Sequence, residues 1–296
     1  MNAPEPEKFR DPGLVDFGGP PDRGRRLELL GGVLVDRPLS HAAGPCHHPH
    51  LWNRAAAVYV APPAGTAGWR LPPSLPDPWL VGVDVGPATL ALEVRPAPSG
   101  QIGVFLEQME QWRWLAAVAP RGRTVLSLFG HSGAASLALA AGGAEVIHVD
   151  ASRQAIALAR RNAAASGLAH LPIRWVCEDA ATFVARQLRR GSRCAGAVLD
   201  PPSWGHGPRG QAFAIDRDLA PLVSDVARLL EPPAGPMLLT CHSPAWRHAR
   251  LEATLIDALR SAGLDGGVAE SGPLACIDAA GRPLPLGDFA RWIDSR

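Results

Sequence analysis

The second half of the sequence alternates strand patterns with helix patterns, and this alternation constrains the fold more than any other feature. Five short apolar runs have the length of strands, and segments of helical period separate them. The runs are TVLSLF, AEVIHVD, PIRWVC, AGAVLD and PMLLTC. Strands that alternate with helices need crossover connections, which produce a parallel sheet with helices on both faces. We therefore predict an α/β fold with a doubly wound, mostly parallel sheet.

The first half of the sequence has a different pattern of apolar and turn-forming residues. From Arg26 to about Arg95, short apolar stretches such as LELLGGVLV and WLVGVDV are separated by clusters of proline and glycine. This pattern predicts a small strand-rich domain, and the regular alternation begins after Arg121. We expect a flexible arm over residues 1–21, the small domain over 22–115 and a larger domain over 116–296.

Composition excludes several classes of protein. The 296 residues are 47% hydrophobic and 19% charged, which is typical of a globular core, and the net charge of +1 produces no strong field toward nucleic acid or membrane. The five cysteines are scattered and odd in number, so we expect no disulfide framework. The polar N-terminus lacks the apolar core of a signal peptide, which predicts a soluble, cytoplasmic protein without membrane association.

The first strand of the alternating half ends in the glycine-containing turn VLSLFGHSG. Gly130 and Gly133 allow a sharp turn and the close approach of a ligand, and the helix that follows offers free amide groups to an anion. A strand-to-helix turn without a ligand is the alternative. The second strand ends at Asp150, about 20 residues later, where an acid hydrogen-bonds ribose in nucleoside-binding folds. An acid there can also cap the helix at Ser152.

The third strand leads into CEDAATF, which places Asp179 where a carboxylate can accept a proton from the exocyclic amine of an adenine. An N-cap role for Asp179 fits the sequence equally well and does not exclude binding. The three loops together predict a pocket for an adenosine with an anionic group near the first helix. A nicotinamide cofactor also contains adenosine, but its usual fingerprint has a third glycine where this chain has Ser136.

The fourth strand runs into DPPSW, from Asp200 to Trp204. Pro201 and Pro202 fix φ, remove two N–H donors and hold the carbonyls of Asp200 and Pro201 outward as preset acceptors for a nucleophile on the substrate. Trp204 offers a flat surface for an unstacked base. A simple turn is the alternative role of the motif. The position after a fourth parallel strand favours a loop that faces the substrate.

These motifs resemble those of class I S-adenosylmethionine (SAM)-dependent methyltransferases, and within that class the bacterial enzymes that methylate bases of large-subunit rRNA. The resemblance extends roughly from Gly103 to the C-terminus and rests on VLSLFGHSG, VDAS, CEDAATF, LDPPSWGHGPRGQAF and LLTCHS. GVFLEQMEQWRWL is similar to the segment that precedes the cofactor domain in these enzymes. The resemblance implies a Rossmann-like seven-stranded sheet, S-adenosyl-L-methionine as cofactor, a catalytic domain over 116–296 and an RNA substrate.

The resemblance also implies roles for single residues. Asp200 would face the methyl group, and methyl transfer from a sulfonium is an in-line displacement in which alignment carries most of the catalysis. The catalytic residues implied are Asp200, Pro201, Pro202 and Trp204. The cofactor-binding residues implied are Phe105, Gln108, Phe129, Gly130, Ser132, Gly133, Asp150, Ala151, Asp179, Ala180 and Asp200.

Cys241 in LLTCHS raises the hypothesis of cytosine C5 methylation, in which a thiolate attacks C6 of the base. Relatives that use cysteine place it directly before the serine corresponding to Ser243, and this chain has His242 there. We therefore interpret Cys241 as a buried cysteine at the end of a core strand.

Two further segments carry groups that can bind ligands. CHHPH, from Cys46 to His50, contains imidazole and thiolate groups of the kind that hold zinc, but adjacent ligands rarely converge on one ion, so we predict no metal site. GHGPRG, which includes Arg209, predicts a mobile cover over the active site that contacts phosphate. An ordinary surface loop is the alternative for that segment.

The sequence thus predicts a SAM-dependent methyltransferase that acts on a nucleobase in RNA, with rRNA as the leading substrate. Methyl transfer to a small molecule and a non-catalytic cofactor-binding module are the alternatives. The oligomeric state is left open.

Overall fold

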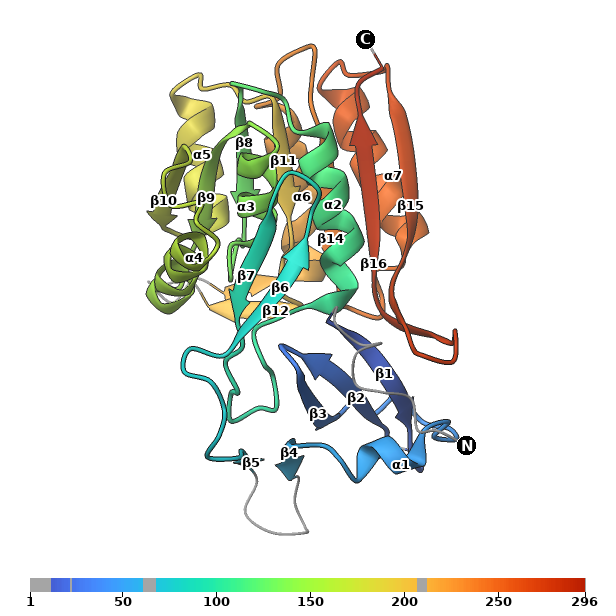
Figure 1. Ribbon diagram of the computed structural model, residues 1–296. Helices are drawn as coiled ribbons and strands as arrows, with labels where there is room; N and C mark the ends of the chain where they lie inside the picture. The colour runs from blue at the N-terminus through green and yellow to red at the C-terminus, as the bar shows by residue number, and fades with distance from the viewer. Residues whose placement is uncertain (1–11, 22, 61–67, 207–211, 296) are drawn as a thin grey trace. The chain divides into compact units, whose positions relative to one another are not determined.

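The alternating half of the chain forms a seven-stranded sheet in the order β10-β9-β8-β11-β14-β16-β15 (Figure 1). The structure is a computed structural model that describes residues 12–21, 23–60, 68–206 and 212–295. Five neighbouring strands are parallel, and β16 is antiparallel to β14, which confirms the predicted fold class. The strands are β8 (Thr124–Leu128), β9 (Glu145–Asp150), β10 (Ile173–Cys177), β11 (Gly196–Leu199), β14 (Met237–Cys241), β15 (Val268–Ile277) and β16 (Pro283–Ile293).

Helices cover this sheet in two layers (Figure 1). In one layer α3 packs between α2 and α4, and in the other α6 packs between α5 and α7. Among the described residues, no helix is long and apolar enough to span a membrane. The helices are α2 (Met109–Val118), α3 (Ala134–Ala141), α4 (Arg153–Ala165), α5 (Ala180–Arg189), α6 (Ile215–Ala227) and α7 (His248–Ser261).

The central strands are apolar on both faces because helices cover both. Every residue of β11 and of β14 is buried, and Leu128, Leu199 and Leu239 are at most 1% exposed. Each such side chain contributes roughly 1.5–3 kcal/mol when fully buried. Burial on both faces explains why these strands read as continuous apolar runs instead of alternating patterns.

The first half of the chain forms a five-stranded sheet in the order β1-β2-β3-β4-β5 and a separate pair, β6-β7. The predicted run LELLGGVLV becomes the β2–β3 hairpin, whose turn needs positive φ at both Gly31 (57°) and Gly32 (81°). The elements are β1 (Gly13–Gly18), β2 (Arg25–Leu30), β3 (Val33–Pro38), α1 (Pro49–Trp52), β4 (Ala57–Val60), β5 (Gly68–Arg70), β6 (Leu80–Asp84), β7 (Thr89–Glu93) and the 3₁₀ turn η2 (Leu106–Gln108).

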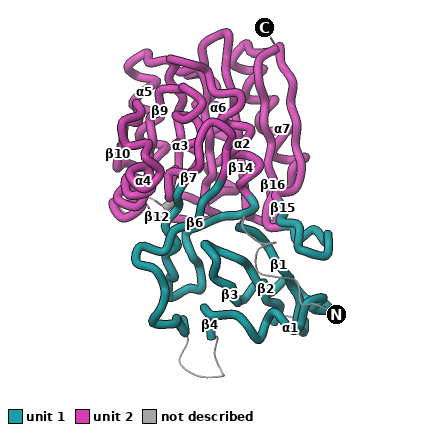
Figure 2. Tube along the Cα trace, viewed as in Figure 1, with its two compact units in different colours: residues 1–83, 91–107, 275–285 teal, residues 84–90, 108–274, 286–296 magenta. Residues whose placement is uncertain are grey.

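The chain divides into two compact units that are discontinuous in sequence (Figure 2). Unit 1 comprises residues 1–83, 91–107 and 275–285, and unit 2 comprises 84–90, 108–274 and 286–296. These bounds differ from the predicted ones. Strand β1 occupies part of the segment predicted as an arm over 1–21, and α2, which the predicted boundary divides, belongs to unit 2 because it packs on α3.

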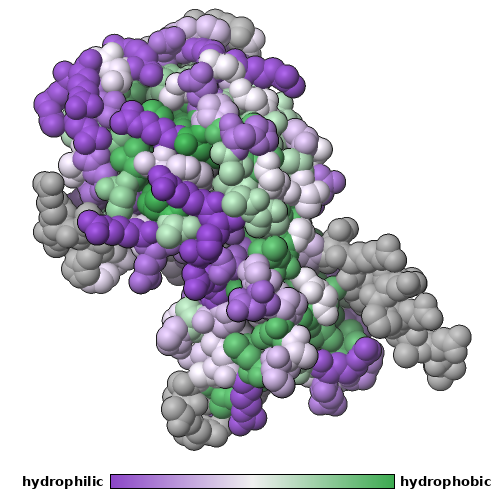
Figure 3. All heavy atoms as spheres, turned by 60° about the vertical axis from the view of Figure 1, so that its left-hand side comes forward, coloured by the Kyte–Doolittle hydropathy of each residue, from purple (hydrophilic) through white to green (hydrophobic). Residues whose placement is uncertain are grey.

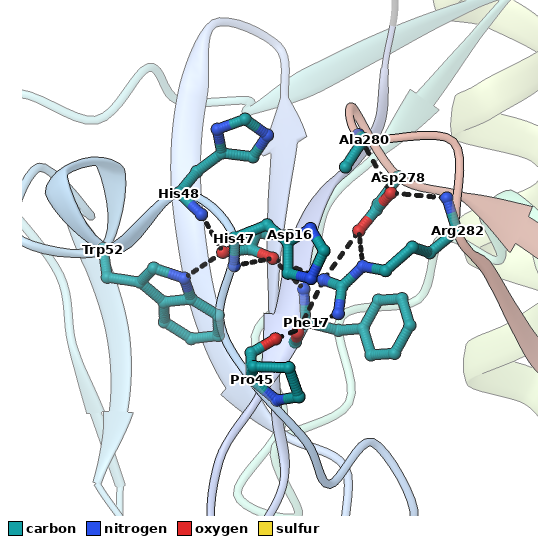
Figure 4. A network of polar contacts seen from close by, with 9 residues as sticks. All are labelled: Asp16, Phe17, Pro45, His47, His48, Trp52, Asp278, Ala280 and Arg282. Carbon is teal, nitrogen blue, oxygen red and sulfur yellow. Dashed lines mark hydrogen bonds and ion pairs between the residues drawn. The ribbon is translucent and has the colours of Figure 1, made fainter.

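The turn between β15 and β16 belongs to unit 1, where a buried carboxylate holds it (Figure 4). Asp16 on β1 is fully buried, and Arg282 in the turn donates to its Oδ1 at 2.7 Å. Arg282 also donates to Asp278 at 2.8 Å, and its guanidinium lies over the Phe17 ring at 4.1 Å. This network explains how residues 275–285 join a unit built mainly from the N-terminal part of the chain.

Asp16 also accepts hydrogen bonds from three groups of the segment that follows β3. The donors are Trp52 Nε1 at 2.8 Å, the His48 amide at 2.8 Å and the His47 amide at 3.1 Å. Burial alone raises the pKa of Asp16, but these hydrogen bonds outweigh burial and hold the pKa below its ordinary value. The CHHPH segment therefore stabilises the Asp16 carboxylate through hydrogen bonds from its backbone amides.

We predict that Asp16→Ala lowers the free energy of unfolding by about 3–5 kcal/mol, because it removes the fully buried carboxylate that accepts from the half-buried Arg282 guanidinium and from three N–H donors. The matched control is Asp225→Ala, which removes an exposed ion pair to Arg228 on α6 and should cost about 0.5 kcal/mol or less. Chemical denaturation measures both. Equal effects of the two substitutions would contradict a stabilising role for the network.

Candidate functional site

Four loops singled out in the sequence follow the carboxyl ends of four neighbouring strands. Gly130 follows β8, Asp150 ends β9, Asp179 follows β10 and Asp200 follows β11. The register aligns these ends, since Leu128 lies opposite both Val149 and Leu199. The strand order reverses between β8 and β11, and such switch points are where open α/β sheets bind ligands. The structure therefore brings the four loops to one edge of the sheet.

The loop after β8 is conformationally strained. Phe129 and His131 both have positive φ, 56° and 41°, which non-glycine residues rarely adopt. Gly133, with φ 83°, precedes α3, and a Cβ there would lie 2.8 Å from Ala159 Cβ. A Cβ at Gly130 would overlap the imidazole of His148. Such strain costs about 1–3 kcal/mol per residue and persists only where the surroundings hold it.

His148 on β9 supports this loop from below. Its ring is fully buried, hydrogen-bonds Ser136 Oγ through Nδ1 at 2.9 Å and lies 4.8 Å from the Trp175 ring. Nε2 is buried without a hydrogen-bond partner among the described residues. Burial, together with the nearby His131, lowers the pKa of His148 to about 3. Sequence reasoning missed His148, although a histidine inside an apolar strand next to a glycine turn is a signal for it.

Asp150 connects the loops after β8 and β9. Its Oδ2 accepts from the His131 amide at 2.9 Å, and its Oδ1 accepts from the Ser152 amide at 2.8 Å. The cap of α4 is Ser152, whose Oγ accepts from the Ala155 amide at 3.2 Å. Asp150 therefore is not the N-cap, and its half-buried carboxylate stands at the strand end.

Asp179 is the N-cap of α5, and its Oδ1 accepts from the Thr182 amide at 2.8 Å. The capping interpretation thus holds, and the adenine contact stays a prediction. Ala180 beside it is buried. Of the other predicted cofactor residues, Ser132 is buried and its carbonyl accepts from Asn162 Nδ2 at 2.8 Å, and the half-buried Ala151 follows Asp150.

The DPPSW loop is tied to the end of β14 by two side-chain hydrogen bonds. Thr240 Oγ1 donates to Asp200 Oδ1 at 2.6 Å, and Ser243 Oγ donates to Ser203 Oγ at 2.5 Å. Trp204 begins the short strand β12 (Trp204–His206), which pairs with β13 (Ala212–Ala214), and is 60% exposed. The sequence did not predict this ribbon or the two hydrogen bonds.

Pro201 is buried and Pro202 is exposed, so the diproline has one side against the protein and one toward solvent. Next to the loop, His242 Nδ1 lies 2.9 Å from the carbonyl oxygen of Leu286. Because a carbonyl oxygen can only accept, Nδ1 carries the hydrogen. The other ring nitrogen, Nε2, lies 3.8 Å from Asp200 Oδ1.

Cys241 is 1% exposed, and its Sγ accepts from the Ser243 amide at 3.3 Å. Burial raises the pKa of this thiol, which disfavours the thiolate that nucleophilic attack requires. The structure therefore places Cys241 in the core of the sheet.

The remaining predicted positions lie in other parts of the chain. The half-buried Phe105 belongs to unit 1, and the buried Gln108 precedes α2 in unit 2, so their contact with a cofactor stays a prediction. Arg209 and all but the first two residues of the predicted cover fall outside the described residues. Within residues 12–21, 23–60, 68–206 and 212–295, no group of three or more potential ligands could hold a metal ion.

The chain is similar over nearly its whole length to a SAM-dependent methyltransferase of known structure from Agrobacterium tumefaciens. The sequences are 33% identical, the TM-score is 0.84, and the match covers 96% of this chain and 90% of the other. The chain belongs to the SAM-dependent methyltransferases. The predicted class and the predicted cofactor, S-adenosyl-L-methionine, are thereby confirmed. A Streptococcus mutans protein described as a candidate SAM-dependent methyltransferase shares the fold of this methyltransferase, with 15% identity, a TM-score of 0.66 and coverage of 91% and 71%.

Curated relatives of the methyltransferase match a shorter stretch. Ribosomal RNA large subunit methyltransferase I of Aeromonas hydrophila is 27% identical over 192 residues, 64% of this chain and 48% of the relative. Ribosomal RNA large subunit methyltransferase K/L of Methylococcus capsulatus is 35% identical over 159 residues, 52% of this chain and 20% of the relative. The chain therefore spans half or less of the length of these relatives. No protein-family model matches it.

We predict an acid-sensitive contribution of His148 to stability. Above pH 6.5 the imidazole is neutral in both states. As the pH falls from 6.5 toward 3, the unfolded chain binds a proton that the folded chain excludes, so stability falls by up to about 1.4 kcal/mol per pH unit. Between pH 7 and pH 5 the wild type should therefore lose about 2 kcal/mol more than His148→Leu.

Urea denaturation at the two pH values measures this difference. His170→Leu, which removes an exposed histidine, is the control and should keep the wild-type dependence. A His148→Leu variant with an unchanged pH dependence would show that the folded state tolerates the charged ring.

Proposed function

We propose that this methyltransferase methylates a nucleobase in RNA, with large-subunit rRNA as the leading substrate. The observation that carries the proposal is the DPPSW loop at the switch point of the sheet. There, Asp200 is fixed by Thr240, and the exposed Trp204 stands four residues further along the same loop. The names of the curated relatives, which are rRNA large subunit methyltransferases, support an RNA base as the substrate.

The donors and acceptors at the sheet edge fit the cofactor. The start of α3 after Gly133 presents backbone amides that suit the carboxylate of the methionine part. The Asp150 carboxylate suits the ribose hydroxyls, and Asp179 with Ala180 suits the adenine. Phe129, Gly130 and Ser132 complete the wall around the methionine part. Gln108 and Ala151 are assigned to the same pocket by resemblance alone, and the cofactor contact of Phe105 stays a prediction.

When bound, S-adenosyl-L-methionine supplies a methyl group on a sulfonium. The protein's task is then to align the substrate atom with the methyl carbon and to exclude water. The backbone carbonyls of Asp200 and Pro201 accept hydrogen bonds from the substrate, and Pro202 keeps the turn rigid. Thr240 orients the Asp200 carboxylate by its hydrogen bond at 2.6 Å. Trp204 stacks on the unstacked base.

The RNA hypothesis also assigns the protein to the cytoplasm. The five cysteines are free thiols, which is compatible with a reducing compartment.

We predict that Asp200→Ala abolishes methyl transfer and leaves the affinity for S-adenosyl-L-methionine within about tenfold of the wild-type value, because Asp200 acts on the substrate side. The control is Asp257→Ala on the exposed face of α7, which should keep both properties. Calorimetry measures cofactor binding, and transfer of labelled methyl measures activity. Full turnover by Asp200→Ala would remove this carboxylate from the mechanism.

We predict that deletion of the gene removes a single methylated base from the rRNA modification map of the source strain, and that the wild-type gene restores it while Asp200→Ala does not. Comparison of the maps of the deletion strain and its parent tests this. An unchanged map, together with labelled methyl found in a small-molecule fraction, would favour the small-molecule alternative. An absence of transfer to any cell fraction would favour the non-catalytic module.

A further inference from the structure

Basic charge is concentrated in one segment of unit 2. Residues 151–193 hold eight of the 29 lysine and arginine residues of the chain but two of the 28 acidic residues. The segment therefore carries a formal charge of +6, and the rest of the chain carries −5. The net charge of +1 conceals this separation.

The segment forms one side of unit 2. It contains α4, β10 and α5. Strand β10 is the edge strand of the sheet, and α4 packs on it. Figure 3 turns this side forward and shows hydrophilic residues over much of it. We define the arginine edge as the exposed arginines of this segment: Arg153, Arg160, Arg161, Arg174, Arg189, Arg190 and Arg193.

The charges of α4 are poorly explained by helix stability. Helix α4 has three arginines and no acidic residue, so it has no i,i+4 ion pair of the kind that stabilises surface helices. Arg153 stands at the first position of α4, where the helix dipole disfavours a cation. In α5, Arg186 pairs with Glu178 at 2.6 Å, and this half-buried arginine is outside the defined edge. A cation in an unfavourable position points to an anionic partner.

The spacing suits a phosphate backbone. Arg153 and Arg160 are seven residues apart on α4, which is two helical turns, so both point to the same side about 10 Å apart along the axis. Helix α4 starts at Arg153, three residues after Asp150, so its arginines begin near the proposed cofactor edge and continue away from it along the helix. Guanidinium groups bind phosphate oxygens in a bidentate manner.

We propose that the arginine edge binds backbone phosphates of the RNA whose base enters the DPPSW site. The proposal rests on the proposed function for the identity of the nucleic acid. The arginine edge binds the RNA strand through charge, and the DPPSW loop at the switch point selects the base. This division separates sequence-independent affinity from base recognition.

The test compares two triple variants of the full chain. Arg153→Gln/Arg160→Gln/Arg174→Gln removes charge from the edge. Arg121→Gln/Arg228→Gln/Arg260→Gln removes equal charge from exposed positions elsewhere on unit 2, at the amino end of β8 and the carboxyl ends of α6 and α7. Binding to a labelled mixed-sequence RNA oligonucleotide is measured between about 50 and 200 mM salt.

The edge variant should lower the slope of log affinity against log salt by about two units, since each lost phosphate contact on a single strand contributes about 0.7. The control variant should keep the wild-type slope. In methylation of total rRNA, the edge variant should raise KM with little change in kcat. A third variant, Arg153→Lys/Arg160→Lys/Arg174→Lys, retains the charge and should retain most of the slope.

A slope in the edge variant equal to that of the control would overturn the proposal. Cofactor affinity, measured by calorimetry, shows that each variant is folded. Failure of the proposed function gives a different result. If the edge variant loses RNA binding but gene deletion leaves the rRNA map unchanged, the edge binds RNA and the methylated substrate is a different RNA or a small molecule. If the map changes but the edge variant binds RNA normally, the RNA uses another surface.

Discussion

The site depends on one constraint of the chain path, the reversal of strand order between β8 and β11. Strands that share a direction end at the same edge of the sheet, so the loops after β10, β9, β8 and β11 lie side by side. The reversal sends the connections after β8 and after β11 to opposite faces of the sheet, and such switch points are where open α/β sheets bind ligands. Family membership in the SAM-dependent methyltransferases is consistent with the use of this switch point for a nucleoside cofactor.

Both loops at the switch point are held by side chains from neighbouring strands. Under the β8 loop, His148 fills the space that a side chain at Gly130 would need, and Asp150 binds the amide of the strained His131. At the β11 loop, Thr240 of β14 fixes the Asp200 carboxylate. Catalysis by alignment requires groups that do not reorganise during the reaction, and these supporting contacts provide that rigidity.

Charge is used in two different ways in the two units. Unit 1 buries the ion pair of Glu28 with Arg37 at 2.6 Å and the Asp16 carboxylate, which pairs with the half-buried Arg282 at 2.7 Å, and hydrogen bonds offset the penalty of removing these charges from water. Unit 2 exposes the arginine edge to solvent. Buried pairs determine which segments pack together, and exposed charges act on partners at a distance. The net charge of the chain, which is near zero, reveals neither arrangement.

The sequence by itself determined the order of strands and helices in the second half, the strand-rich character of the first half and the four loops of the site, because local period and turn residues encode them. The tertiary structure alone decided the position of β16 between β14 and β15 and the return of residues 275–285 to unit 1. It also decided that His148 lies under Gly130. These features depend on contacts between residues far apart in the chain, which local patterns do not encode.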